Sequence, residues 1–197
     1  MPIDIGEHRC SLGFFGFNSR GDRLAVTAVH CSDQIPDQPV YADNGVQIGQ
    51  VVAWKPDVED GDRKLVGSRG YTVFLVYNRF SLDPFFTHES TSVKNGDYVS
   101  KYGERTGKTN GHVTGLATVP NRPDLDLIKS NMVQLPGDSG CPWYINGPTI
   151  VGIAPSGDQE SDGGDAGSQA QPIQAVIDMI RMNSTTWDND FKMWSKD

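Results

Sequence analysis

Short apolar runs, separated by glycine and proline, follow one another along most of the chain. The sequence holds 22 glycines and 12 prolines, which divide it into segments too short for long helices. Apolar runs bounded in this way are typical of β-strands. We therefore expect strands over nine ranges, which are 12–17, 23–29, 46–54, 71–77, 97–102, 112–119, 128–134, 141–145 and 149–154.

One segment near the C-terminus has a different period. Ile173, Val176, Ile177 and Ile180 recur at the i, i+3, i+4, i+7 spacing of a helix with one buried face. Pro172 precedes them, where a first helical turn tolerates proline. The pattern predicts an all-β domain with one C-terminal helix over 171–183.

The remaining segments are predicted to be loops and a tail. The longer loops are 32–45, 55–70, 78–96 and 155–170, and loops of this length in a compact domain often carry function. The tail 184–197 carries three aromatic side chains, which either dock onto the body of the protein or belong to a frayed end. These aromatic residues are Trp187, Phe191 and Trp194.

Length and charge narrow the class of protein. A chain of 197 residues suggests one domain or two small halves that share a core. Seventeen basic residues against 25 acidic ones give a net charge of −8, the wrong sign for a nucleic-acid partner. No apolar run is long enough to span a membrane, and the N-terminus has no signal-peptide pattern. We therefore expect a soluble, acidic domain that binds neither nucleic acid nor a membrane.

The three cysteines raise a question of redox state. If the first hairpin turns at Arg20 and Gly21, Cys10 lies directly opposite Cys31, close enough for a disulfide. Such a bond would contribute about 3 kcal/mol through loop entropy. The alternative is two small buried thiols. The disulfide would indicate a secreted protein, and free thiols a cytoplasmic or phage-associated one.

Two segments carry candidate chemistry. An apolar strand ends at His30, and Ser139 stands between glycines in the segment 136–142. A serine hydroxyl is a weak nucleophile until a base removes its proton, and histidine is best suited to that near neutral pH. Neighbouring glycines let backbone amides turn toward a developing oxyanion. Taken alone, each segment also fits a structural histidine or an ordinary turn.

At these residues the chain resembles the chymotrypsin-like serine proteases, in particular their bacterial streptogrisin-type branch. The resemblance implies two antiparallel six-stranded β-barrels, at about 1–90 and 91–170, with the active site between them. It covers nearly the whole chain, which we interpret as a single peptidase domain. The matching segments are 9–14, 24–31, 103–107, 111–113 and 135–140, with a weaker match at 170–173.

The resemblance also implies roles for individual residues. His30 corresponds to the general base and Ser139 to the nucleophile, and the amides of Gly137 and Ser139 correspond to the oxyanion hole. Asp138 corresponds to a buried carboxylate that needs a basic partner.

Lys101 is the first candidate for that partner and Arg105 the second. The alternative for Lys101 is a solvated position on its strand.

The chain departs from the family at the third catalytic position. Where an aspartate is expected, the alignment has Thr72, and no carboxylate occurs between Asp62 and Asp83. Either the preceding acidic loop supplies the group or a weaker partner holds the histidine, so the third triad member stays unknown. The loop candidates are Asp57, Glu59, Asp60 and Asp62.

Two further departures concern the surroundings of Ser139. The half-cystine expected beside the specificity pocket is replaced by Val133, and Cys141 stands where the family has glycine. Cys141 is either a small buried side chain or a reactive thiol. The acidic loop 158–165 is interpreted as solvated rather than as a calcium site. The resemblance implies that this loop borders the specificity pocket, which suggests a preference for basic substrate residues.

These observations predict a serine endopeptidase that cleaves peptide bonds through an acyl-enzyme on Ser139, with no cofactor and no metal. We expect a monomer whose partner is a peptide or protein substrate. The alternative is a catalytically impaired protein of the same fold that binds peptides or a partner protein in its cleft, which the missing aspartate favours.

Overall fold

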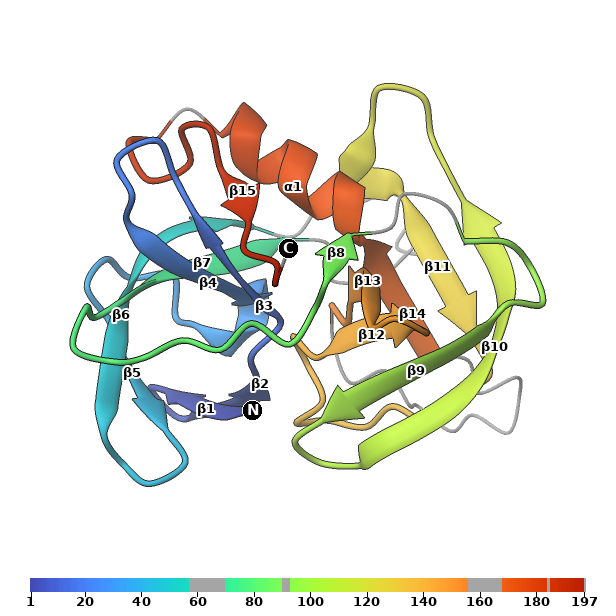
Figure 1. Ribbon diagram of the computed structural model, residues 1–197, viewed down its shortest axis with the longest axis horizontal. Coiled ribbons are helices and arrows are strands. Elements are labelled where there is room, and N and C mark those ends of the chain that lie inside the picture. Colours follow the sequence, from blue (N-terminus) through green and yellow to red (C-terminus); the bar gives the residue numbers. More distant parts are fainter. Residues whose placement is uncertain (57–69, 90–92, 156–167, 184, 197) are drawn as a thin grey trace.

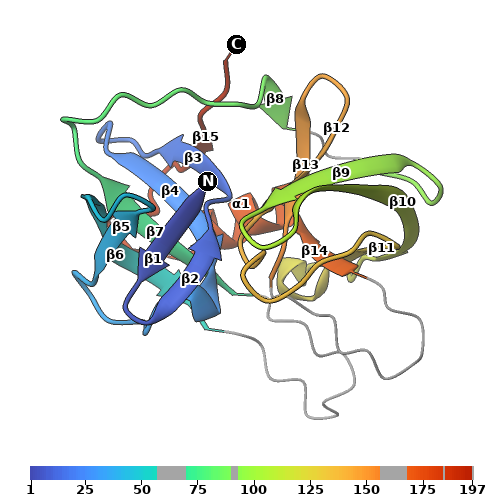
Figure 2. The same cartoon turned by 90° about the horizontal axis from the view of Figure 1, so that it is seen from below.

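The computed structural model describes residues 1–56, 70–89, 93–155, 168–183 and 185–196. The described residues form two β-sheet halves that lie side by side, and the α-helix α1 (Ile173–Met182) lies across their junction (Figure 1). The segment between β7 (Tyr71–Val76) and β8 (His88–Glu89) crosses from the N-terminal to the C-terminal half (Figure 2). The all-β prediction and the helix near 171–183 are confirmed.

The C-terminal half is a closed barrel of six strands. Their order is β12-β9-β10-β11-β14-β13, and an additional pairing between β12 and β13 closes the ring. β8 pairs in parallel with the start of β13, at Thr149 and Ile150, before β13 pairs with β14. The strands are β9 (Tyr98–Gly103), β10 (Gly107–Ala117), β11 (Leu127–Ser130), β12 (Pro142–Ile145), β13 (Thr149–Ile153) and β14 (Ser168–Pro172).

The N-terminal half differs from the expected six-stranded barrel, because its described strands form an open eight-stranded sheet in the order β15-β3-β4-β7-β6-β5-β1-β2. Its outer edge at β3 is covered by a strand from the C-terminal tail rather than by a closing strand. The strands are β1 (Pro2–Ile5), β2 (His8–Ser11), β3 (Phe14–Phe17), β4 (Arg23–Ala28), β5 (Pro39–Ala42), β6 (Gln47–Lys55), β7 and β15 (Lys192–Met193).

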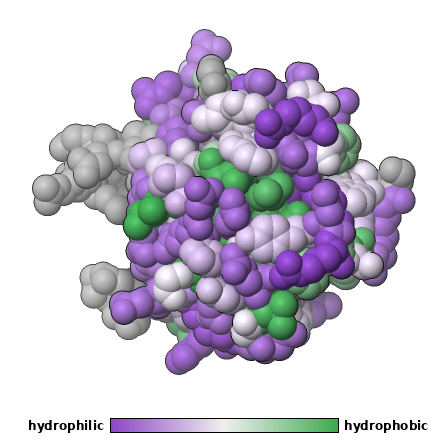
Figure 3. All heavy atoms as spheres, turned by 90° about the vertical axis from the view of Figure 1, so that its left-hand side faces the viewer, coloured by the Kyte–Doolittle hydropathy of each residue, from purple (hydrophilic) through white to green (hydrophobic). Residues whose placement is uncertain are grey.

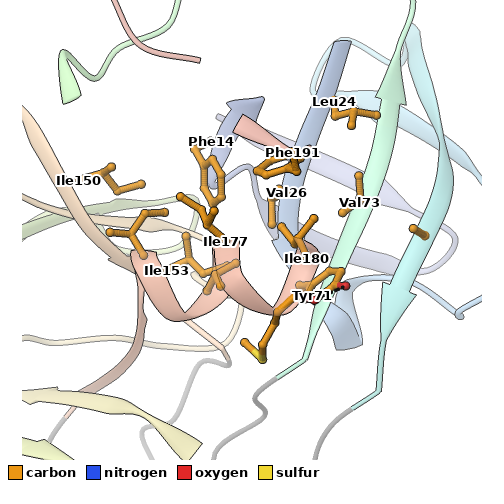
Figure 4. Packing of buried hydrophobic residues seen from close by; sticks show 14 of the residues in the cluster. Phe14, Leu24, Val26, Tyr71, Val73, Ile150, Ile153, Ile177, Ile180 and Phe191 are labelled. Carbon is orange, nitrogen blue, oxygen red and sulfur yellow. Dashed lines mark hydrogen bonds between the residues drawn. The ribbon is translucent and has the colours of Figure 1, made fainter. Parts of the chain in front are cut away.

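Among the described residues, the apolar cluster with the most members lies between the halves and includes residues of α1 (Figure 4). Ile177 and Ile180 of the helix contact this cluster, which also contains Ile150 and Ile153 of the barrel. Phe191 from the tail is fully buried, with its ring centroid 6.1 Å from that of Phe14. The tail is therefore docked, and it helps to fix the junction where the candidate site lies.

The visible face of the N-terminal half is mostly hydrophilic around a small apolar area (Figure 3). This distribution agrees with the acidic composition of the chain. Within the described residues, no helix is long and apolar enough to cross a membrane.

Candidate active site

His30 and Ser139 come from opposite halves of the molecule and meet at their junction. β4 ends at Ala28, and the short 3-10 turn η1 (Val29–Cys31) that follows carries His30. Ser139 lies in the loop before β12. His30 Nε2 is 2.8 Å from Ser139 Oγ, although the two residues are 109 positions apart in the sequence. The fold thus brings together a base and a hydroxyl in hydrogen-bond contact.

A disulfide joins Cys10 to Cys31, directly beside His30, with a Cα–Cα distance of 6.0 Å. The predicted bond is confirmed, but the hairpin argument for it is wrong. In the hairpin, Phe14 pairs with Val26, one position away from the assumed register.

Cys10 is in fact on β2, where it pairs with Ile3, and Cys31 lies in η1. The bond therefore ties β2 to the turn that presents His30. Both sulfur atoms lie near the His30 ring, but sulfurs consumed in a disulfide are not thiolate ligands, so this group does not form a metal site.

Two glycines with positive φ shape the loop around Ser139. Gly137 has φ of 103° and Gly140 has φ of 85°, conformations that side chains rarely adopt. At Gly140, a Cβ atom would lie 2.0 Å from Thr27 Oγ1. The loop therefore packs directly against β4, and Ser139 itself is only 3% exposed.

The carboxylate of Asp138 is fully buried and receives five hydrogen bonds. Lys101 Nζ lies 3.1 Å from Asp138 Oδ2, and both side chains have no exposed surface. The predicted pairing with Lys101, rather than Arg105, is thereby confirmed. The other four donors are the amides of Leu135, Arg105 and Thr106 and the hydroxyl of Thr106.

Burial alone would raise the pKa of Asp138. The hydrogen bonds from Thr106 and Leu135, together with the charge of Lys101, outweigh this effect and hold the pKa below its usual value. Asp138 is therefore an ionised anchor for the loop that carries Ser139. The hydrogen bonds of Thr106 to Asp138 were missed in the sequence, because a threonine in the short turn between β9 and β10 gives no distinctive pattern.

Thr72, at the position where an aspartate was expected, is fully buried in β7. Its Oγ1 lies 3.0 Å from Ser32 Oγ and donates to the carbonyl of Val29 at 3.3 Å. Thr72 therefore braces the residues that flank His30. The candidate carboxylates of the acidic loop lie outside the described residues, namely Asp57, Glu59, Asp60 and Asp62.

Cys141 is fully buried and free of disulfide bonding. Burial raises the pKa of its thiol to about 12, so the thiol is protonated near neutral pH. Of the two alternatives for this residue, the structure supports the small buried side chain. The acidic loop 158–165 lies outside the described residues.

Comparisons with known proteins agree with the geometry of the candidate site. Serine protease 2 of Streptomyces fradiae is 29% identical over 177 residues, covering 77% of this chain and 88% of that protein. No protein-family model matches the chain.

Solved structures share the fold. One is a glutamic acid-specific serine protease that uses a histidine triad in substrate binding, with a TM-score of 0.67 and 20% identity over 90% of this chain and 94% of that one. Another is Thermobifida fusca protease A, with a TM-score of 0.66 and 18% identity over 98% and 96%. The resemblance predicted from the motifs is confirmed by these similarities.

Proposed function

We propose that this chain, a relative of the chymotrypsin-like serine proteases of bacteria, is itself a serine endopeptidase. Its relatives are serine proteases, which supports a protease function for the family as a whole. The observation that carries the finer proposal is the 2.8 Å contact between His30 Nε2 and Ser139 Oγ. A nucleophile and a base within hydrogen-bond reach are the geometric requirement for acyl transfer.

In the proposed reaction, Ser139 Oγ attacks the carbonyl carbon of the substrate peptide bond while His30 accepts its proton. The tetrahedral intermediate collapses as His30 donates that proton to the leaving amine, which leaves an acyl group on Ser139. A water molecule then attacks the acyl group and gives a proton to His30. The bond from the acyl carbon to Ser139 Oγ breaks as His30 returns that proton to Oγ, and the product acid departs.

The amides of Gly137 and Ser139 are the proposed donors to the oxyanion. The positive φ of Gly137 supports this assignment, because it permits a loop conformation that an L side chain would strain. Loss of one such donor costs about 10²–10³ in kcat in enzymes of this kind.

The rival function is a catalytically impaired protein that binds peptides in the cleft. The observation that favours it is Thr72, a hydroxyl at the position of the expected aspartate. Removing the aspartate from a serine-protease triad lowers turnover about 10⁴-fold, because the histidine loses its correct tautomer. The two proposals therefore differ in rate rather than in fold.

The test is labelling with a serine-directed fluorophosphonate. We expect the parent protein to be labelled, and neither Ser139→Ala nor His30→Ala to be labelled at a comparable rate. Ser100→Ala is the matched control, since Ser100 is a buried serine whose hydroxyl bonds to Asn110 at 2.7 Å and not to the loop of Ser139. Labelling that persists in Ser139→Ala, or a parent that is never labelled, contradicts the endopeptidase proposal.

The confirmed disulfide bears on where the protein works. Disulfides persist in oxidising environments and are rare in the cytosol. We therefore propose that the protein is exported and meets its peptide or protein substrates outside the cytoplasm.

A further inference from the structure

Ser11 is a buried serine on the N-terminal half that contacts the loop of the proposed nucleophile on the other half. It is the last residue of β2 and has no exposed surface. Its neighbour Cys10 forms the disulfide to Cys31, next to His30. Ser11 thus lies between the turn that carries the proposed base and the loop that carries the proposed nucleophile.

Both polar groups of Ser11 that face this loop bind backbone carbonyls. The hydroxyl donates to the carbonyl oxygen of Gly137 at 3.1 Å, and the amide donates to the carbonyl oxygen of Ser139 at 2.9 Å. Gly137 and Ser139 are the two residues whose own amides are the proposed oxyanion donors. Ser11 therefore binds the carbonyl groups of both residues.

The hydroxyl of Ser11 is itself held in place. It accepts a hydrogen bond from the amide of Glu104 at 2.8 Å, which fixes the direction in which its proton can be donated. Glu104 in turn accepts from Arg9 Nε at 2.9 Å. On its other side, the carbonyl of Ser11 accepts from Thr27 Oγ1 at 2.8 Å.

Gly137 needs such a contact more than the non-glycine residues of the loop. It has no Cβ to restrict its backbone, and its φ of 103° is one of several conformations open to glycine. The next peptide is fixed at both ends, because Ser11 binds the Gly137 carbonyl and the amide of Asp138 donates to the carbonyl of Leu135 at 2.9 Å. With that peptide fixed, the orientation of the Gly137 amide depends on the φ and ψ torsions of Gly137 itself.

We propose that Ser11 is a positioning residue that preorganises the oxyanion hole, with its hydroxyl holding Gly137 in the conformation that aims its amide at the oxyanion. This inference rests on the proposed endopeptidase function. Preorganised donors act only on charge that develops in the transition state, so a looser Gly137 lowers kcat and leaves substrate binding unchanged.

The experiment compares the parent protein with Ser11→Ala and Ser11→Gly, both of which remove the hydroxyl and keep the backbone amide. We expect kcat on a peptide amide substrate to fall about tenfold, from the usual effect of leaving one buried acceptor unpaired, while KM stays within about twofold. Fluorophosphonate labelling should slow by a similar factor.

The matched control is again Ser100→Ala, a buried serine in the barrel with one hydrogen bond to Asn110. It should leave kcat unchanged, and thermal unfolding of all variants reports any general loss of stability. A kcat of Ser11→Ala or Ser11→Gly equal to that of the parent overturns the proposal. An equal fall in kcat in the Ser100→Ala control also overturns the proposal.

Amide hydrogen exchange supplies a readout that does not depend on activity. We expect the Gly137 amide to exchange faster in Ser11→Ala than in the parent, and at the parent's rate in Ser100→Ala. If the parent is never labelled by the fluorophosphonate, the endopeptidase function fails, and this measurement alone decides the role of Ser11. An unchanged exchange rate at Gly137 then overturns the positioning role.

Discussion

The buried ion pair between Lys101 and Asp138 yields a sharp stability prediction through the substitution Lys101→Met. Methionine keeps much of the side-chain volume and removes the ammonium group, so that the carboxylate of Asp138 loses one of its five hydrogen bonds. Both side chains are 0% exposed, so water cannot replace the lost partner.

The magnitude follows from what remains around Asp138. Breaking a buried ion pair by removing one partner typically costs 3–5 kcal/mol, and the four remaining donors place this case near the lower end, at about 3 kcal/mol. With an m-value near 2 kcal/mol/M, the urea midpoint should fall by about 1.5 M.

The assay is urea unfolding at pH 7 and at lower pH. Because the folded pKa of Asp138 is depressed, its ionised form stabilises the fold above its usual pKa, and this contribution is lost as the pH falls through the folded value. The difference between parent and Lys101→Met should therefore shrink as the pH falls below the usual aspartate pKa of about 4 and through the depressed folded value, because the carboxyl group is then protonated in both proteins.

The control is Lys129→Met, which removes an exposed lysine from β11 of the same barrel. It should change the free energy of unfolding by less than about 0.5 kcal/mol. The reasoning is refuted if Lys101→Met unfolds at the same urea concentration as the parent, or if Lys129→Met costs as much.

Three further predictions concern other contacts. Replacing Cys10 and Cys31 together by alanine opens a loop of 21 residues and should lower the free energy of unfolding by about 3 kcal/mol, measured by urea unfolding. Gly103→Ala places a Cβ 2.1 Å from Asp138 Oδ1 and should cost about 3 kcal/mol in the same assay. Asp188→Asn should raise the free energy of unfolding at pH 7 by about 2 kcal/mol. Burial raises the pKa of the Asp188 carboxyl to about 6, so the parent loses stability as the pH rises from the usual aspartate pKa of about 4 to this folded value.

Each of these predictions has a control with the same chemistry in a different setting. Cys141→Ala removes a buried thiol but keeps the disulfide, so it should lower the free energy of unfolding by clearly less than the double replacement of Cys10 and Cys31. Gly115→Ala adds a Cβ whose nearest neighbour is at 3.8 Å, an ordinary contact. Asp190→Asn alters an exposed carboxyl group and should change the free energy of unfolding at pH 7 by less than about 0.5 kcal/mol. A control variant whose free energy of unfolding changes as much as that of the variant it matches contradicts the corresponding prediction.

The sequence predicted the elements whose pattern is strong and local. The helix was found because its isoleucines and valine fall on one face, and β4 and β7 because they are continuous apolar runs. β1 and β2 were missed because each has only four residues, and polar side chains interrupt the apolar pattern of both. Their pairing depends on partners elsewhere in the sheet, which no local window contains.

The disulfide shows how a correct pairing can follow from an incorrect geometry. The assumed hairpin would place the two cysteines on adjacent strands, whereas the chain leaves the hairpin at both ends before it reaches them. Cys10 lies on a strand that pairs with β1, and Cys31 lies in a turn. The two cysteines are close in the sequence, which favoured their contact. That closeness did not determine which strand and which turn bring them together.

Some residues of the candidate site could be predicted from the sequence and others could not. The predictable ones have a role that fixes their backbone position. Gly137 and Gly140 are recognisable because a loop with positive φ requires glycine at those places, and Asp138 because its carboxylate is anchored to the adjacent strand. A group that orients His30 has no such constraint, since a carboxylate on any loop of sufficient reach can serve. Thr72 therefore shows only that β7 does not supply a carboxylate at this position, and it moves the search to the acidic loop rather than ending it. Substituting the four acidic residues of that loop singly by their amides should identify the group, as the one variant whose kcat falls by orders of magnitude while its fluorescence-detected unfolding stays like that of the parent.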